Sequence, residues 1–147
     1  MSYITNGDIE KRLGTALYIE LTDDTGGGSA DPVKVDEARL AAEGEVNSHL
    51  AARYQTPVSL ASEPTVAAVL RGVALDLAVY RMHLRKPPVP ADVVRARADA
   101  VAWLEGVAAG SIHLPAMSPL QGSEAGGIVA EKAGPQRTMT RDGMKDL

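Results

Sequence analysis

Apolar residues recur every three or four positions in three long segments, the spacing that places side chains on one face of an α-helix. Asp31-Pro32 opens the first segment and Ser62-Glu63-Pro64 the second, each with a polar residue ahead of a proline in the first helical turn. The third segment has Asp92 in its first turn, and Gly110 supplies its stop. The predicted inward positions are Val35, Ala38, Ala42, Val46, His49 or Leu50, and Tyr54; then Val66, Val69, Leu70, Val73, Leu77, Tyr80 and Leu84; then Val94, Ala98, Val101, Leu104, and Val107 or Ala108.

A shorter helical segment precedes these three. Thr5 stands at an N-cap position with Asp8 three residues on, a carboxylate version of the capping box. Gly14 is expected to divide the segment into two short helical pieces, residues 7–13 and 15–21. The following residues, 22–30, include three consecutive glycines, which predict a mobile and exposed loop.

The pattern changes near Pro115. Beyond it glycine and proline recur, no helical or strand period survives, and Ile128-Val129 is an isolated apolar pair. We therefore predict an all-α protein: a small bundle of about four helices over residues 1–114, a flexible glycine-rich loop, and an extended C-terminal arm over residues 115–147.

Composition adds that the core is thin. Apolar residues make up 45% of the chain, but aromatic residues only 3%, and phenylalanine is absent. A core of small aliphatic side chains in a short chain indicates that neighbouring subunits complete the burial. Cysteine is also absent, which excludes disulfides and thiolate sites and suits synthesis in a reducing cytoplasm. Neither a signal peptide nor a membrane-spanning run is visible, so no membrane partner is expected.

Candidate catalytic or metal-binding chemistry is weak throughout. The three histidines, His49, His83 and His113, do not share the spacing that places two ligands on one helix face. Asp23 and Asp24 lie near the glycines without the alternating carboxylates of a calcium loop, and the glycines have no phosphate-binding motif. The sequence therefore predicts no enzyme activity, no metal and no cofactor.

Basic residues cluster around the end of the second long helix and the proline turn after it. One interpretation is cations placed favourably at a helix C-terminus on a solvated face. The other is a basic rim that meets an acidic neighbour or passing DNA, although the net charge of −4 argues against nucleic acid as the default partner. Trp103, at the edge of the third helix's core face, is either core or an interface anchor. The predicted rim is Arg81, Arg85, Lys86, Arg95 and Arg97.

The C-terminal arm has two interpretations as well. Its basic and apolar residues are spaced at two to three positions, as in an extended segment that presents them to a groove or a sheet edge of another protein. The alternative is an end without function. The candidate docking residues are Ile128, Val129, Arg137, Met139, Arg141 and Met144.

Three stretches, taken in order, resemble one family. They are Glu45 to Tyr54 with Pro57-Val58 after it, Leu70 to Arg81 followed by the Arg85-Lys86-Pro87-Pro88 break, and Trp103 to Gly110. Together with the opening Tyr3-Ile4-Thr5, this order is similar to the Mu-like phage head-tail connector (adaptor) family over residues 2–114.

The resemblance implies a virion subunit without catalytic activity, made in the bacterial cytoplasm and placed in the neck between capsid and tail. Such a subunit forms a ring of about twelve copies beneath the portal protein. It lines the DNA channel, with DNA only as passing cargo, and carries the neck, stopper or tail-completion protein. The alternative from the residues themselves is a helix-turn-helix DNA-binding or DNA-packaging protein that uses the basic cluster.

Overall fold

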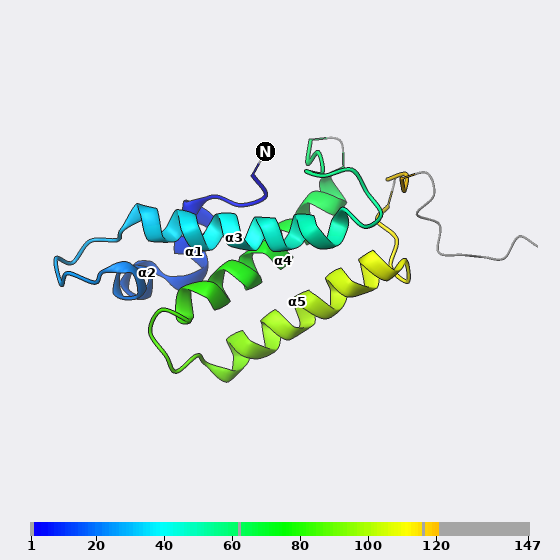
Figure 1. Ribbon diagram of the computed structural model, residues 1–147. Coiled ribbons are helices and arrows are strands. Elements are labelled where there is room, and N and C mark those ends of the chain that lie inside the picture. The colour runs from blue at the N-terminus through cyan, green and yellow to red at the C-terminus, as the bar shows by residue number, and fades with distance from the viewer. Residues whose placement is uncertain (1, 62, 116, 121–147) are drawn as a thin grey trace, which may run out of the picture.

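The computed structural model describes residues 2–61, 63–115 and 117–120, and within these it contains five helices and no strand (Figure 1). The all-α prediction is confirmed. The helices are α1 (Asn6–Leu13), α2 (Thr15–Thr22), α3 (Pro32–Leu50), α4 (Pro64–His83) and α5 (Ala91–Ala109).

Three long helices form the body of the molecule. α3, α4 and α5 run in alternating directions, with α4 in contact with both of the others (Figure 1). The short helices α1 and α2 pack against α3 and α4, but among the described residues neither of them touches α5. α3 also contacts every other helix, but α4 has the larger set of buried side chains, so α4 is the central element, as its many apolar positions predict.

Local signals explain where the helices begin and end. The Thr5 hydroxyl accepts a hydrogen bond from the Asp8 N–H, and the Asp8 carboxylate accepts one from the Thr5 N–H, which completes the capping box of α1. Gly14, at φ +81°, separates α1 from α2 as predicted. The Asp31 carboxylate caps α3 by accepting from the Val33 N–H, with Pro32 in the first turn.

The core contains two tyrosines that use both their rings and their hydroxyls. Tyr3 and Tyr54 are among the largest fully buried side chains, as are Leu70 and Leu77 of α4. The Tyr3 hydroxyl donates to Asn47 Oδ1 at 2.6 Å and accepts from the Val58 N–H at 3.0 Å. These aromatic side chains join the N-terminal segment and the α3–α4 connection to a core that is otherwise mostly aliphatic.

Several predicted details are wrong. α3 ends at Leu50, so the buried Tyr54 belongs to the connection that follows it. Val69, Leu84, Val94 and Ala98 are exposed instead of facing inward. On α5 the buried residues are Ala100, Leu104 and Val107. The reason is that α1 and α2 do not reach α5, so only a narrow row of its side chains is covered.

The chain after α5 folds back over the end of the bundle. Gly110 closes α5 in the left-handed conformation, and a Cβ added there would lie 2.3 Å from Nη1 of the buried Arg53. The Leu114 N–H donates to the Tyr54 hydroxyl at 3.1 Å, and the Leu120 N–H donates to the Arg53 carbonyl at 2.7 Å. Packing therefore continues to Leu120, a few residues past the composition change at Pro115.

Candidate interaction surfaces

The described residues contain no group of three or more histidine, cysteine, aspartate or glutamate side chains placed to hold a metal ion. No helix in these ranges is long and apolar enough to cross a membrane. The candidate interaction surfaces are the basic cluster, the glycine loop, the exposed apolar residues and the cavities between helices.

Two members of the predicted basic rim meet on one carboxylate of α3. Arg81 Nη2 lies 2.7 Å from Glu45 Oε2, and Arg97 Nη2 lies 3.4 Å from Glu45 Oε1. The Arg97 guanidinium also stacks over the Tyr80 ring, 4.8 Å from its centroid. These contacts link α3, α4 and α5. Both arginines therefore have a partner within the chain.

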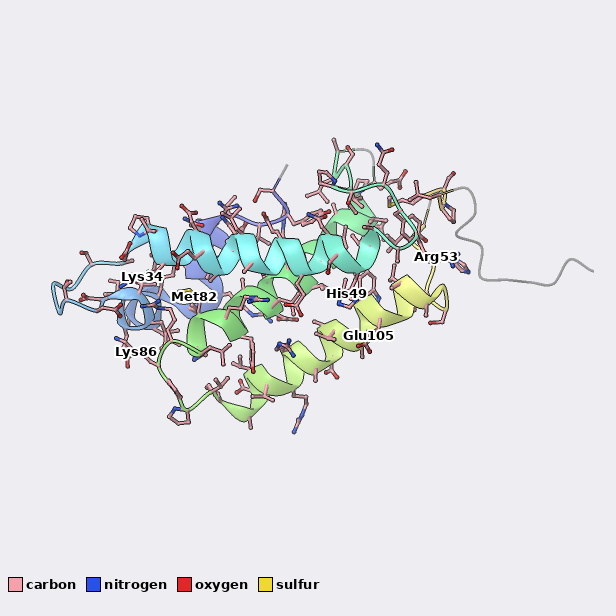
Figure 2. All side chains as sticks on the ribbon, in the orientation of Figure 1. Lys34, His49, Arg53, Met82, Lys86 and Glu105 are labelled. Carbon is pink, nitrogen blue, oxygen red and sulfur yellow. The ribbon has the colours of Figure 1, made fainter. Side chains whose placement is uncertain are left out.

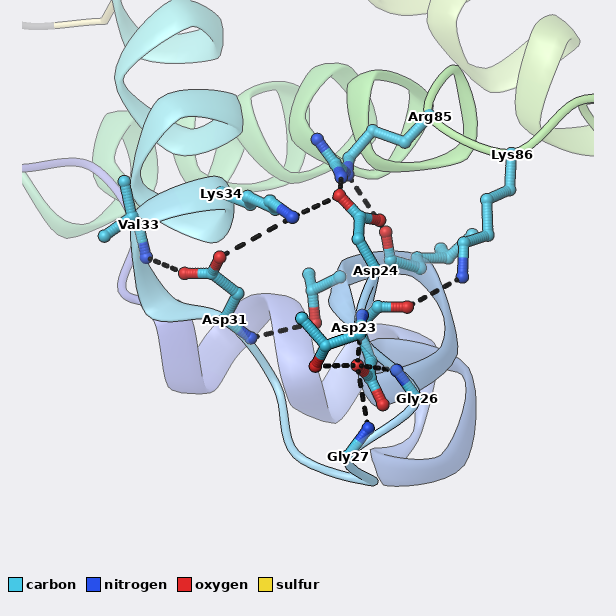
Figure 3. A network of polar contacts seen from close by, with 12 residues as sticks. Asp23, Asp24, Gly26, Gly27, Asp31, Val33, Lys34, Arg85 and Lys86 are labelled. Carbon is cyan, nitrogen blue, oxygen red and sulfur yellow. Dashed lines mark hydrogen bonds and ion pairs between the residues drawn. The ribbon is translucent and has the colours of Figure 1, made fainter.

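Two other members of the rim hold the glycine loop (Figure 3). Arg85 forms an ion pair with Asp24 at 2.7 Å and donates from Nε to the Leu21 carbonyl at 3.0 Å. Lys86 donates to the carbonyls of Glu20 and Asp23. Lys34 approaches Asp24 from α3, so this carboxylate receives one cation from α3 and another, Arg85, from the segment just after α4. Figure 2 shows Lys34 and Lys86 at this end of the molecule and Arg53 at the other.

Residues 24–29 of the loop are exposed, as predicted, whereas Thr22 is the buried last residue of α2. The loop backbone is bound to the side chain of Asp23. Asp23 accepts hydrogen bonds from the N–H groups of Thr25, Gly26, Gly27 and Gly28 at 2.7–3.3 Å. These bonds, led by the one from Gly28, lower the pKa of Asp23 to about 2. Lys34 and Arg85 lower the pKa of Asp24 below its usual value. The glycine amides therefore already surround an anion, which agrees with the absence of a phosphate motif.

The predicted rim is thus divided among three environments. Arg81 and Arg97 share Glu45, Arg85 and Lys86 hold the loop, and Arg95 is exposed with no ion pair within the described residues. Trp103 is half-buried and packs against the core. The candidate arm residues Ile128, Val129, Arg137, Met139, Arg141 and Met144 lie outside the described residues.

A groove that sequence reasoning missed runs along α4. Its cavity of about 290 Å³ has α1 and α2 on one side, α5 on the other, and α4 as the floor. Asp76 on the floor forms an ion pair with Arg12 at 2.8 Å, and burial raises the pKa of this carboxyl. Further lining residues are Leu13, Leu17, Val79, His83, Pro90, Asp92, Val93 and Ala96. The groove depends on α5 standing apart from α1 and α2, which the spacing of apolar residues within single helices does not reveal.

Comparison with known proteins bears on the resemblance found in the sequence. The family model described as "Bacteriophage Mu, Gp36" matches residues 3–131, most of the chain. No curated protein gives a significant match. The family match confirms that the resemblance is to a Mu-like phage protein, and such membership suggests a structural or morphogenetic role. The chain belongs to the bacteriophage Mu Gp36 family.

Proposed function

We propose that the protein is a structural subunit of the phage particle that acts as a head-tail adaptor. In this role it forms a closed ring beneath the portal, contributes to the wall of the DNA channel and joins the capsid to the neck or tail. Residues 115–147 serve as the arm that docks on a neighbouring protein. The family match over residues 3–131 is the observation that carries the proposal.

The described surface supports an assembly role. Six large apolar side chains are exposed, and the groove along α4 is open to solvent. Single exposed apolar side chains are common, but helix faces without a partner in a thin-cored protein favour association. The exposed residues are Val33, Leu40, Val69, Leu84, Val94 and Leu120.

The DNA-binding alternative receives less support from this surface. Glu45 and Asp24 pair with Arg81, Arg97 and Arg85, and the chain is acidic overall. Nonspecific DNA binding requires cations that are available to replace the counterions of the phosphates. We expect the isolated protein to show no salt-dependent binding to duplex DNA in the submicromolar range.

The test is to remove the gene product from a phage that encodes it and to examine the particles by electron microscopy. We expect DNA-filled or emptied heads and separate tails without joined particles, and joining is expected to return when the protein is supplied from a plasmid. Cryo-electron microscopy of complete particles should show a ring of this helical fold directly below the portal. Joined, infectious particles that lack the protein would overturn the proposal.

The arm is tested separately with a variant that ends at Leu120. The described contacts of the body stop there, so the truncated protein should unfold at the denaturant concentration of the full chain. It should nevertheless fail to restore joined particles. Full restoration would remove the arm from the proposal while leaving the adaptor role in place.

A further inference from the structure

The groove along α4 has charged and polar groups between apolar walls. Asp76 and His83 line it from α4, and Asp92 lines it from the first turn of α5. Burial raises the pKa of Asp76, and the nearby carboxylate of Asp99 on α5 raises it further. Against these three carboxylates, the described lining supplies the guanidinium of Arg12, and its remaining side chains are apolar. The groove is therefore acidic, and it suits a cation with an apolar stem.

The polar groups of the groove are incompletely paired within the chain. His83 is 7% exposed, and no hydrogen bond of its imidazole ring is found within the described residues. A buried polar side chain without a partner requires an explanation. Asp92 is exposed and has no ion pair in the same residue ranges, and Asp76 meets Arg12 through Oδ1 alone. A guanidinium has five N–H donors and no acceptor, so it can satisfy two carboxylates and a ring nitrogen together.

The chain contains a segment of matching chemistry outside the described residues. Residues 132–141 include Lys132, Arg137 and Arg141 and no acidic residue, with Met139 between the two arginines. This segment is basic, whereas the groove has an excess of carboxylates. Complementary charge of this kind directs association and fixes its register.

The segment is also long enough to reach the groove of another copy. Leu120 is bound to the Arg53 carbonyl at the end of the bundle where α5 stops, and the groove lies at the end where α5 begins. α5 has 19 residues and is therefore about 28 Å long. Residues 121–132 span up to about 40 Å when extended. The basic segment of one copy can therefore meet the groove of a copy that stands beside it.

We propose that the groove along α4 of one copy receives an arginine side chain from residues 132–141 of the neighbouring copy. The guanidinium meets Asp92, the second oxygen of Asp76 and the ring of His83, and the apolar walls cover its stem. This inference rests on the proposed function, in which the arm docks on a neighbouring protein, and it makes that protein another copy of this chain. Each arm then joins unlike surfaces, a head-to-tail contact that generates a ring when its rotation closes.

The first test uses the absence of cysteine. One chain carries Ala96→Cys in the groove wall, and a second carries Met139→Cys in the basic segment. A short thiol-specific cross-linker should join the two variants in an equimolar mixture, and mass spectrometry should find position 96 linked to position 139. Leu40→Cys replaces Ala96→Cys in the control, because Leu40 is 59% exposed on α3 and lies outside the groove. Cross-linking is done on concentrated purified protein and on particles that contain both variants.

The outcomes separate the docking site from the adaptor function. Absence of the 96–139 link in both preparations, or an equal yield of the 40–139 link, overturns the inference. A link confined to single chains of the double variant Ala96→Cys/Met139→Cys overturns the assignment to a neighbouring copy. A head-tail location of the protein without the link keeps the proposed function and removes this site. A link in purified protein, together with infectious particles that lack the protein, keeps the site and removes the adaptor function.

The second test exchanges the charges of the proposed partners in the full chain. Asp92→Lys, or Arg137→Glu together with Arg141→Glu, should lower the yield of the 96–139 link by at least about tenfold. Combining the changes should restore most of the yield, because opposite charges face each other again. Asp92→Asn, which keeps the shape of the side chain, should lower the yield by a smaller factor.

Glu105→Lys is the matched control for the charge exchange. Glu105 is an exposed carboxylate of α5 that lies outside the groove (Figure 2). Its replacement should leave the yield of the 96–139 link unchanged. An equal loss in Glu105→Lys and Asp92→Lys, or no recovery when the charges are exchanged, would overturn the inference.

Discussion

The two ends of the bundle are closed by different kinds of contact. At one end, the loop of residues 22–30 is held by Asp23, Asp24, Lys34 of α3 and Arg85 just after α4 (Figure 3). At the other end, the chain after α5 covers Arg53 and Tyr54, which are almost completely buried. Charged contacts in water contribute little to stability, whereas unmade hydrogen bonds in the interior are costly. The first end is therefore shaped by its polar network, and the second contributes to the stability of the whole fold.

The largest expected difference between the ends comes from cutting back apolar side chains. Leu50 is fully buried where the chain after α5 folds over the bundle, and Leu17 is half-buried near the loop. We expect Leu50→Ala to lower the free energy of unfolding by about 2–5 kcal/mol, because it leaves a cavity in the core. Leu17→Ala should cost about 1 kcal/mol, because its site is already open to water. Urea denaturation followed by circular dichroism measures both, and equal costs would contradict the comparison.

A second prediction uses two glycines with similar positive φ angles. Gly110 has φ +83° and Gly28 has φ +75°, but a Cβ at Gly110 would strike Arg53, whereas one at Gly28 would meet nothing within 4 Å. We expect Gly110→Ala to cost about 2–3 kcal/mol, from left-handed strain and the displaced guanidinium together. Gly28→Ala should cost about 1 kcal/mol from the strain alone. Thermal unfolding of the pair measures the difference, and a larger loss at Gly28 would contradict this account.

The sequence predicts those features of the structure that depend on residues close together in the chain, and it misses those that depend on contacts between helices. Asp31-Pro32 and Gly110 mark helix ends through contacts within a few residues, so the start of α3 and the end of α5 follow from the local pattern. The end of α3 at Leu50 does not, because the apolar period continues to Tyr54. Val94 and Ala98 fit an apolar period but face solvent, because burial on α5 is decided by which helices reach it. The spacing within one helix carries no information about its neighbours.

The candidate surfaces show the same limit. The sequence identifies the cations Arg81, Arg85 and Arg97 as a cluster, but their partners Glu45 and Asp24 lie far away along the chain. Asp23 ahead of three glycines is a local signal for a carboxylate that binds turn amides, and it could have predicted the ordered loop backbone. The groove along α4 could not be found in this way, because it depends on the separation of α5 from α1 and α2.

A third prediction concerns one hydrogen bond at the buried end. The Tyr54 hydroxyl accepts from the Leu114 N–H, and Tyr54→Phe would leave that buried amide without this acceptor. We expect a loss of about 1–2 kcal/mol in the free energy of unfolding. Tyr80→Phe is the matched control. Tyr80 is half-buried, and no hydrogen bond of its hydroxyl is found within the described residues. The free energy of unfolding of this variant should therefore be unchanged. The Leu114 amide should also exchange faster with solvent in Tyr54→Phe, and unchanged exchange would contradict the role of this bond.

The smallest expected effect is the response of the loop to acid. The pKa of Asp23 is lowered to about 2 in the folded protein, below the usual value of a carboxyl, because the loop amides bind its charged form. The stabilisation is therefore fully present above the usual pKa and is lost as the pH falls through about 2. NMR titration should show the amide signals of Gly26 and Gly28 moving with a midpoint near that pH, and Asp23→Asn should abolish the transition. The Leu114 amide donates to the Tyr54 hydroxyl and not to a carboxylate, so it should not follow the same curve; a shared midpoint would mean that the two ends respond to acid as one unit.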